Sequence, residues 1–144
     1  MLDDTLNLLT DVHHGAKMGV ESIDALIKAA DAKEIKEKLL HTQNEYKKFV
    51  EEADGAIQKR GEIPKEIGIM SKIMVHGMVG IGAAFDPSDK KQVQMLIKGF
   101  EMASEEISQS LQKNEHARES AKQMAFDLLR MQQREIKNFK KYLS

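Results

Sequence analysis

The sequence of 144 residues predicts an all-α fold, a bundle of four long helices, and three observations support this. The chain has only 2 prolines and lacks the alternation of apolar and polar residues that is typical of strands. Apolar residues instead recur at intervals of three and four, as on one face of a helix. Residues suited to helix ends separate these periodic segments. The length is typical of one domain, so we expect a single helical domain over residues 1–144.

The predicted helix ends follow from capping residues. Asp3 is expected to cap the first helix, and Asp31 with Glu34 resembles a capping box for the second. Pro87 favours the start of a helix directly after it, and Asn114 is the expected cap of the last helix. The predicted helices lie at about 4–30, 33–60, 65–84, 88–112 and 115–142.

Four of these five helices carry a single apolar stripe, which must be buried against the others. In the first helix the stripe consists of Leu2, Leu6, Leu9, His13, Ala16, Val20, Ile23, Ile27 and Ala30. The stripe of the second helix contains the aromatic pair Tyr46 and Phe49, and that of the last helix contains Gln132. Packing the four stripes together predicts the four-helix bundle.

The remaining predicted helix, at about 65–84, is apolar on nearly all sides. Ile67–Phe85 reads IGIMSKIMVHGMVGIGAAF, a length that would suit a membrane span. Lys72, His76 and the glycines argue against a span, as does the lack of an aromatic or basic flanking belt. We expect either a connector helix buried along the bundle or a subunit interface. A helix with apolar residues all round favours a homodimer through Ile67–Phe85.

Composition excludes several classes of function. A net charge of -1 gives no basic excess for nucleic-acid binding, and the absence of cysteine excludes disulfides and thiolate metal sites. The sequence shows no nucleophile with a paired base and no phosphate-binding loop, so we do not expect an enzyme. The first residues show no basic and apolar leader, which favours a cytoplasmic protein.

Two helices, a crossover of about 25 residues and two further helices resemble the ferritin-like superfamily, which includes rubrerythrin and bacterioferritin. The similar stretches are Leu6 to Leu9 followed by Gly15, Asn44–Pro64 and Asp89–Leu111. The resemblance implies the ferritin-like bundle topology. For the metal-binding members it also implies a di-iron site, with one Glu on each of two helices and a Glu-x-x-His on each of the other two.

The di-iron motif is degenerate in this chain. The two candidates for Glu-x-x-His both lack the histidine, and they read Glu45-x-x-Lys48 and Glu135-x-x-Asn138. The positions that face inward at this spacing on the second helix are Tyr46 and Phe49, which fill space and do not ligate metal. No standard di-iron centre is therefore expected.

Several polar residues are nevertheless predicted to face inward. His13 lies on the stripe of the first helix, as a core histidine or as one ligand of a metal site. Asp24 and Glu135 are expected at one height if the first and last helices run parallel. With Thr42 and Gln132 nearby, they would either hold a hard cation or form a buried polar network with a lysine such as Lys17.

Two functions remain open from the sequence. The first is a non-catalytic ferritin-like bundle, a structural, interaction or stress-associated protein with no bound cofactor. The alternative is a rubrerythrin-like protein that binds iron or manganese, or another divalent metal, in oxidative stress or metal handling. Its ligands would be drawn from His13, Asp24, Glu101 and Glu135.

Overall fold

The structure is a computed structural model and describes residues 3–61 and 89–143. These residues form four long α-helices and one short 3-10 helix, with no strand among them, which confirms the all-α four-helix bundle. The elements are α1 (Asp4–Ala29), α2 (Lys33–Lys59), α4 (Asp89–Lys113), α5 (Glu119–Lys140) and η1 (Lys141–Leu143). The apolar helix predicted at about 65–84 lies outside the described residues.

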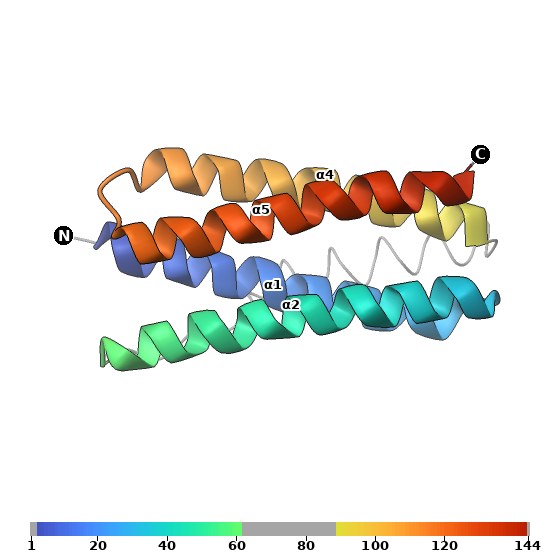
Figure 1. The fold of residues 1–144 in the computed structure, drawn as a ribbon, viewed down its shortest axis with the longest axis horizontal. Coiled ribbons are helices and arrows are strands. Elements are labelled where there is room, and N and C mark those ends of the chain that lie inside the picture. The colour runs from blue at the N-terminus through green and yellow to red at the C-terminus, as the bar shows by residue number, and fades with distance from the viewer. Residues whose placement is uncertain (1–2, 62–88, 144) are drawn as a thin grey trace.

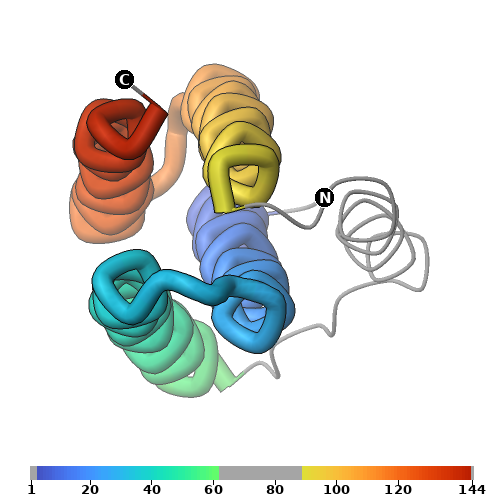
Figure 2. Tube along the Cα trace, turned by 90° about the vertical axis from the view of Figure 1, so that its right-hand side faces the viewer, coloured from blue at the N-terminus to red at the C-terminus, as the bar shows by residue number. Residues whose placement is uncertain are grey.

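The helices form two antiparallel pairs, α1 with α2 and α4 with α5 (Figure 1). Along the long axis, α1 and α5 run in one direction, and α2 and α4 run in the other. Seen along that axis, the α4–α5 pair lies over the α1–α2 pair (Figure 2). A short turn joins the two helices within each pair, and residues 62–88 connect the α1–α2 pair to the α4–α5 pair.

The start of α1 confirms one predicted cap, whereas the start of α2 differs from the prediction. The Asp3 carboxylate accepts the Thr5 N–H at 2.8 Å, as expected of an N-cap. The predicted capping box of Asp31 is wrong, because α2 is preceded by Ala32 and has no side-chain cap of its own. The carboxylate of Asp89 takes this place from α4 and accepts the N–H groups of Asp31 and Ala32 at 2.9 and 2.8 Å.

The start of α5 also differs from the prediction. Asn114 is not its cap, because the helix begins at Glu119. Asn114 is buried instead, and its side-chain amide donates to the Ser110 carbonyl at 2.9 Å. The Ser110 carbonyl also accepts the backbone N–H of Asn114 at 2.9 Å, so the backbone and the side chain of Asn114 both bond to the last turn of α4.

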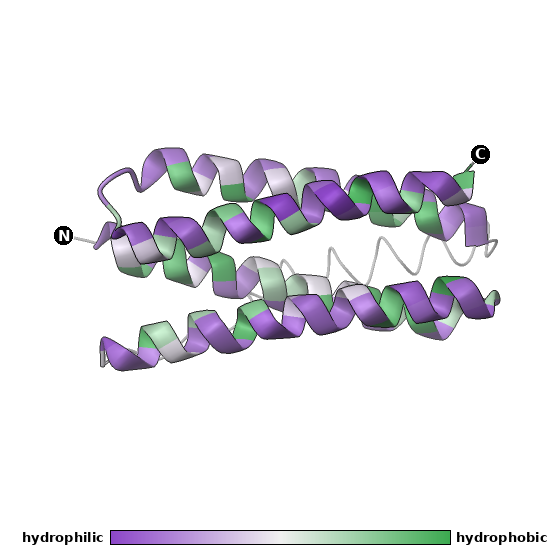
Figure 3. Cartoon of the chain, in the orientation of Figure 1, coloured by the Kyte–Doolittle hydropathy of each residue, from purple (hydrophilic) through white to green (hydrophobic). Residues whose placement is uncertain are grey.

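The core runs the length of the bundle, and hydrophilic residues interrupt the apolar ones along each helix at helical spacing (Figure 3). On α1 the predicted stripe is partly correct, since Leu9, Ala16 and Ile23 are buried. Leu8 and Leu26 are buried although they lie outside the predicted stripe. The buried face is wider than one stripe because α1 contacts α2, α4 and α5. Within the described residues, no helix is long and apolar enough to cross a membrane.

Candidate functional site

Two seams of the bundle stand apart from the ordinary apolar core. Between α2 and α5 lies a cluster of charged side chains, which we call the charge network and which consists of Lys38, Glu45, Arg134 and Glu135. Between α1 and α4 lies an apolar groove, which we call the α1–α4 groove. Each predicted site residue can be placed relative to these two features.

Glu135 is the centre of the charge network. Its side chain is only 1% exposed, yet it faces two cations and one amide. Lys38 Nζ lies 3.1 Å from Glu135 Oε2, and an Arg134 guanidinium nitrogen lies 3.0 Å from Oε1. The Asn138 amide donates to Oε2 at 3.3 Å. The buried carboxylate is therefore paired and hydrogen-bonded, which such a group requires.

The electrostatics of Glu135 follow from these partners. Burial by itself raises the pKa of the Glu135 carboxyl, but the hydrogen bonds and charges of Lys38 and Arg134 outweigh it and lower the pKa below its ordinary value. Glu135 is therefore ionised at neutral pH. Arg134 also pairs with Glu45, and Glu45 in turn contacts His41 Nε2 at 3.2 Å. The network thus extends from the core to the surface.

Tyr46 of α2 reaches both α5 and the α1–α4 groove. Its hydroxyl donates to Gln132 Oε1 at 3.3 Å, on the side of α5. Its ring stacks on Phe100 with centroids 6.2 Å apart and covers Gly19 so closely that an added Cβ there would lie 2.6 Å from ring carbons. Burial and the nearby Glu135 raise the pKa of the Tyr46 hydroxyl, so it stays protonated.

His13 lies away from this network. It is 6% exposed, and its Nδ1 has no hydrogen-bond partner among the described residues. Burial lowers its pKa, with smaller contributions from His14 and Lys17 in the same direction, whereas the Asp54 carboxylate on α2 raises it. The net lowering keeps the imidazole neutral at pH 7.

The predicted metal ligands divide into two buried and two exposed residues. His13 and Glu135 are buried, whereas Glu101 is exposed on α4. The expectation that Asp24 faces inward with Glu135 is wrong: its side chain is 54% exposed and pairs with Lys28 at 3.1 Å, one turn along α1. The part of the chain that the structure describes contains no group of three or more His, Asp or Glu placed to hold a metal ion.

The lysine expected beside Glu135 is Lys38 rather than Lys17. The sequence analysis did not single out Lys38 or Arg134 as a partner of Glu135. A usable signal was present, because Lys38 lies four residues before Thr42, which belongs to the same predicted inward set. In the structure the Thr42 hydroxyl donates to the Lys38 carbonyl at 3.0 Å.

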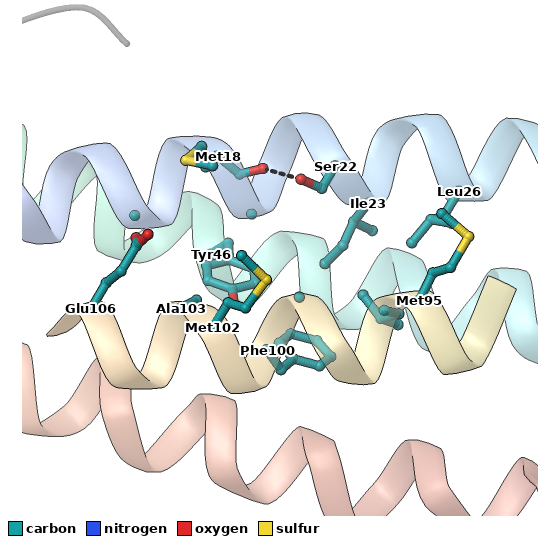
Figure 4. Close-up of a pocket in the computed structure, with 14 residues that line it drawn as sticks. Met18, Ser22, Ile23, Leu26, Tyr46, Met95, Phe100, Met102, Ala103 and Glu106 are labelled. Carbon is teal, nitrogen blue, oxygen red and sulfur yellow. Dashed lines mark hydrogen bonds between the residues drawn. The ribbon is translucent and has the colours of Figure 1, made fainter. Parts of the chain in front are cut away.

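The α1–α4 groove has a volume of about 100 Å³ and is almost wholly apolar. In Figure 4, Met18 and Ile23 of α1 face Met95 and Met102 of α4, with Tyr46 of α2 behind them. Its full lining is Gly15, Met18, Gly19, Ser22, Ile23, Leu26, Tyr46, Met95, Leu96, Gly99, Phe100, Met102, Ala103 and Glu106. Glu106, at one end, is the only carboxylate among these residues.

The described residues thus form a four-helix bundle with one charged seam and one apolar seam. The chain belongs to a family described as a domain of unknown function (DUF2383), whose sequence profile matches residues 4–113. The match spans α1, α2 and α4 and ends before α5, which supplies Glu135 and Arg134. No curated protein and no solved structure matches the chain significantly.

Proposed function

We propose that this chain is a non-catalytic ferritin-like helical bundle, a structural or interaction protein without the standard di-iron centre. The helix directions support the ferritin-like assignment, because α1 and α5 run together, opposite to α2 and α4, with a long connection between the pairs. The observation that carries the functional proposal is the pairing of Glu135 with Lys38 and Arg134.

These residues do not fit a di-iron centre. Such a centre uses several carboxylates and histidines to offset the charge of two metal ions, whereas Glu135 is already paired with two protein cations. A divalent ion that replaced one partner would remain close to the other. At about 4 Å, each pair of unit charges repels by about 4 kcal/mol at an effective dielectric constant near 20. Lys38 and Arg134 therefore oppose metal binding at Glu135.

Metal analysis of protein purified without chelator tests the proposal directly. We expect substoichiometric iron and manganese, and no oxygen-dependent oxidation of added Fe²⁺ above the rate in buffer. Glu135→Gln serves as the matched control, because it retains the shape of the side chain and removes its charge. Iron near two atoms per chain in the unaltered protein, with oxidase activity that Glu135→Gln removes, would overturn the proposal.

One observation favours the alternative, a metal-binding protein in oxidative stress or metal handling. The buried Nδ1 of His13 has no hydrogen-bond partner among the described residues, as a vacant ligand would. In that case Fe²⁺ or Mn²⁺ raises the thermal midpoint of unfolding, and His13→Ala abolishes the rise. Glu101→Ala tests the candidate ligand on α4 in the same way. An unchanged midpoint at saturating metal excludes this alternative.

A further inference from the structure

Methionine sulfur is concentrated at the α1–α4 groove. The chain has 9 methionines and no cysteine, so the thioethers are the side chains that a peroxide oxidises most readily. Five methionines lie within the described residues. Three of them, Met18, Met95 and Met102, line the groove, whereas Met124 and Met131 belong to α5. Among the described residues, oxidation would therefore act mainly on this groove.

The three groove methionines differ in their access to solvent. Met102 is 40% exposed, and among the described residues only Leu40 and Phe126 are large apolar side chains with similar exposure. Met18 and Met95 are partly buried. In Figure 4 the side chains of Met95 and Met102 both extend from α4 toward α1. A dissolved oxidant thus reaches Met102 more easily than the other two.

The reaction at Met102 needs a hydroperoxide and no further reagent. The thioether sulfur attacks the terminal oxygen of the hydroperoxide, so that a sulfur–oxygen bond forms and the oxygen–oxygen bond breaks. The hydroxyl proton moves to the departing oxygen, which leaves as an alcohol, or as water when the oxidant is hydrogen peroxide. The sulfur loses two electrons and the peroxide gains them. The product is methionine sulfoxide, which is polar where the thioether was apolar.

The groove has no free side-chain donor for a sulfoxide oxygen. Two hydroxyl groups are the only side-chain donors among its described lining residues, and both are engaged. The hydroxyl of Ser22 donates to the Met18 carbonyl at 2.8 Å. The hydroxyl of Tyr46 donates to Gln132 Oε1 at 3.3 Å. A sulfoxide oxygen at Met102 must therefore stay in water, which its exposed position allows.

Oxidation at Met102 should consequently change the surface of the bundle without unfolding it. The rim of the groove becomes polar and hydrated, while the buried Phe100 beneath it keeps its place in the core. At Met131, which is only 4% exposed, the same product would place an acceptor in the core without a donor. The position of Met102 therefore combines access for the oxidant with tolerance of the product.

We propose that Met102 is a modification site at which a hydroperoxide converts the α1–α4 groove from an apolar to a polar surface. The conversion reverses when methionine sulfoxide reductases restore the thioether. The apolar surface of the groove is then available under reducing conditions and is lost on oxidation. The proposal goes beyond the proposed function and does not depend on it, because the groove lining contains none of the candidate metal ligands.

Peptide mapping by mass spectrometry tests the site itself. The protein is treated with hydrogen peroxide at neutral pH, in the presence of a chelator that prevents metal-catalysed oxidation. We expect Met102 to gain an oxygen atom at least about fivefold faster than Met95 and Met131. Treatment with the reductases should remove this oxygen. A rate at Met102 that does not exceed the rates at Met95 and Met131 would overturn the proposal.

Hydrophobic-interaction chromatography tests the effect on the groove. Peroxide should shorten the retention of the unaltered protein and of the control Met95→Leu, and it should affect Met102→Leu much less. Without peroxide, Met102→Gln should elute close to the oxidised protein, because its amide is polar and of similar size. The methionines outside the described residues are present in all four proteins, so their oxidation contributes equally.

Two results of this second experiment would overturn the proposal. One is an equal loss of retention in Met102→Leu and in the unaltered protein, which would assign the change to other residues. The other is a loss of helical circular dichroism when Met102 is oxidised, because the effect would then be unfolding and not a change of surface. Exchange of methionine for leucine is well tolerated in packed regions, so both leucine variants should fold.

Discussion

The seam between α2 and α5 and the seam between α1 and α4 use opposite chemistry within one bundle. The first places Lys38 and Arg134, which are both partly exposed, beside the buried carboxylate of Glu135, which pairs with both. The second is lined by methionine, leucine and glycine, with the carboxylate of Glu106 at one end. In the first seam each charged side chain of the network has an ion-pair partner among the described residues. The second presents apolar surface around an open groove.

The charged seam therefore fixes the register of the helices, whereas the apolar seam offers a surface that another apolar surface could cover. An ion pair at a buried carboxylate contributes little net free energy, but it penalises a shift of α5 against α2, because another register would leave the buried Glu135 carboxylate unpaired. An apolar groove imposes no such restriction and gains free energy when another apolar surface covers it. Tyr46 belongs to both seams, through its hydroxyl on one side and its ring on the other.

The largest effect is expected from breaking the charged seam on one side. Glu135→Ala leaves Lys38 and Arg134 without their shared partner and should lower the free energy of unfolding by about 3 kcal/mol. Urea denaturation followed by circular dichroism measures the loss. In the matched double variant, Lys38→Met with Glu135→Leu, both charges are replaced and most of the stability should return. An equal loss in the two variants would show that the pairing is not what the seam requires.

The next effect tests the contact between the two seams. Gly19→Ala places a Cβ about 2.6 Å from the Tyr46 ring and must displace it. We expect a loss of about 2 kcal/mol, which is typical of overpacking in a filled core. Gly55→Ala is the control, since its Cβ meets no neighbour, and it should gain up to about 1 kcal/mol from helix propensity. Thermal unfolding that ranks the two variants in the reverse order would contradict the packing.

A smaller effect separates the hydroxyl of Tyr46 from its ring. Tyr46→Phe retains the stacking on Phe100 and removes the bond to Gln132, so we expect a loss of about 1 kcal/mol. A double-mutant cycle with Gln132→Leu isolates the bond, because the second substitution should cost less once the hydroxyl is gone. Strictly additive losses would mean that the two side chains do not interact.

The smallest effect concerns pH and His13, which belongs to neither seam. Its folded-state pKa is lowered, so the unfolded chain binds a proton more readily, and stability falls as pH decreases below about 6.5. Denaturation midpoints measured between pH 7.5 and 5.5 should decline in the unaltered protein and change less in His13→Gln. Glu135 does not interfere in this range, because its own lowered pKa makes its contribution disappear only under more acidic conditions. Parallel declines in both proteins would exclude His13 as the cause.

Much of the fold was predictable because helical periodicity and capping residues are local signals. The four helices lie within a few residues of their predicted bounds, and Asp3 caps α1 as expected. The start of α2 was not predictable, because its N–H groups are satisfied by Asp89, which is 57 residues distant from Ala32. A cap supplied by another helix leaves no local pattern.

The candidate site was less predictable for the same reason. The burial of His13 and Glu135 follows from their places on helical stripes, and the structure confirms it. The outward position of Asp24 was missed, because its predicted inward place depended on where α1 meets its neighbours rather than on α1 alone. The α1–α4 groove is lined by residues of α1, α2 and α4, so it depends on how these helices pack together, which the periodicity of any one of them does not contain.

The Asp89 carboxylate accepts the N–H groups of Asp31 and Ala32 in the turn after α1, and these two hydrogen bonds bear on the order of folding. The α1–α2 and α4–α5 pairs are closed by short turns, so each can form quickly from contacts close in sequence. These hydrogen bonds close a loop of more than fifty residues, and the chain entropy lost in closing the loop must be overcome before the bonds can form. We therefore expect them to form after the main folding barrier. Interactions that form after the barrier leave the folding rate almost unchanged and slow unfolding. Asp89 is therefore expected to lengthen the lifetime of the folded state without changing how fast the chain folds.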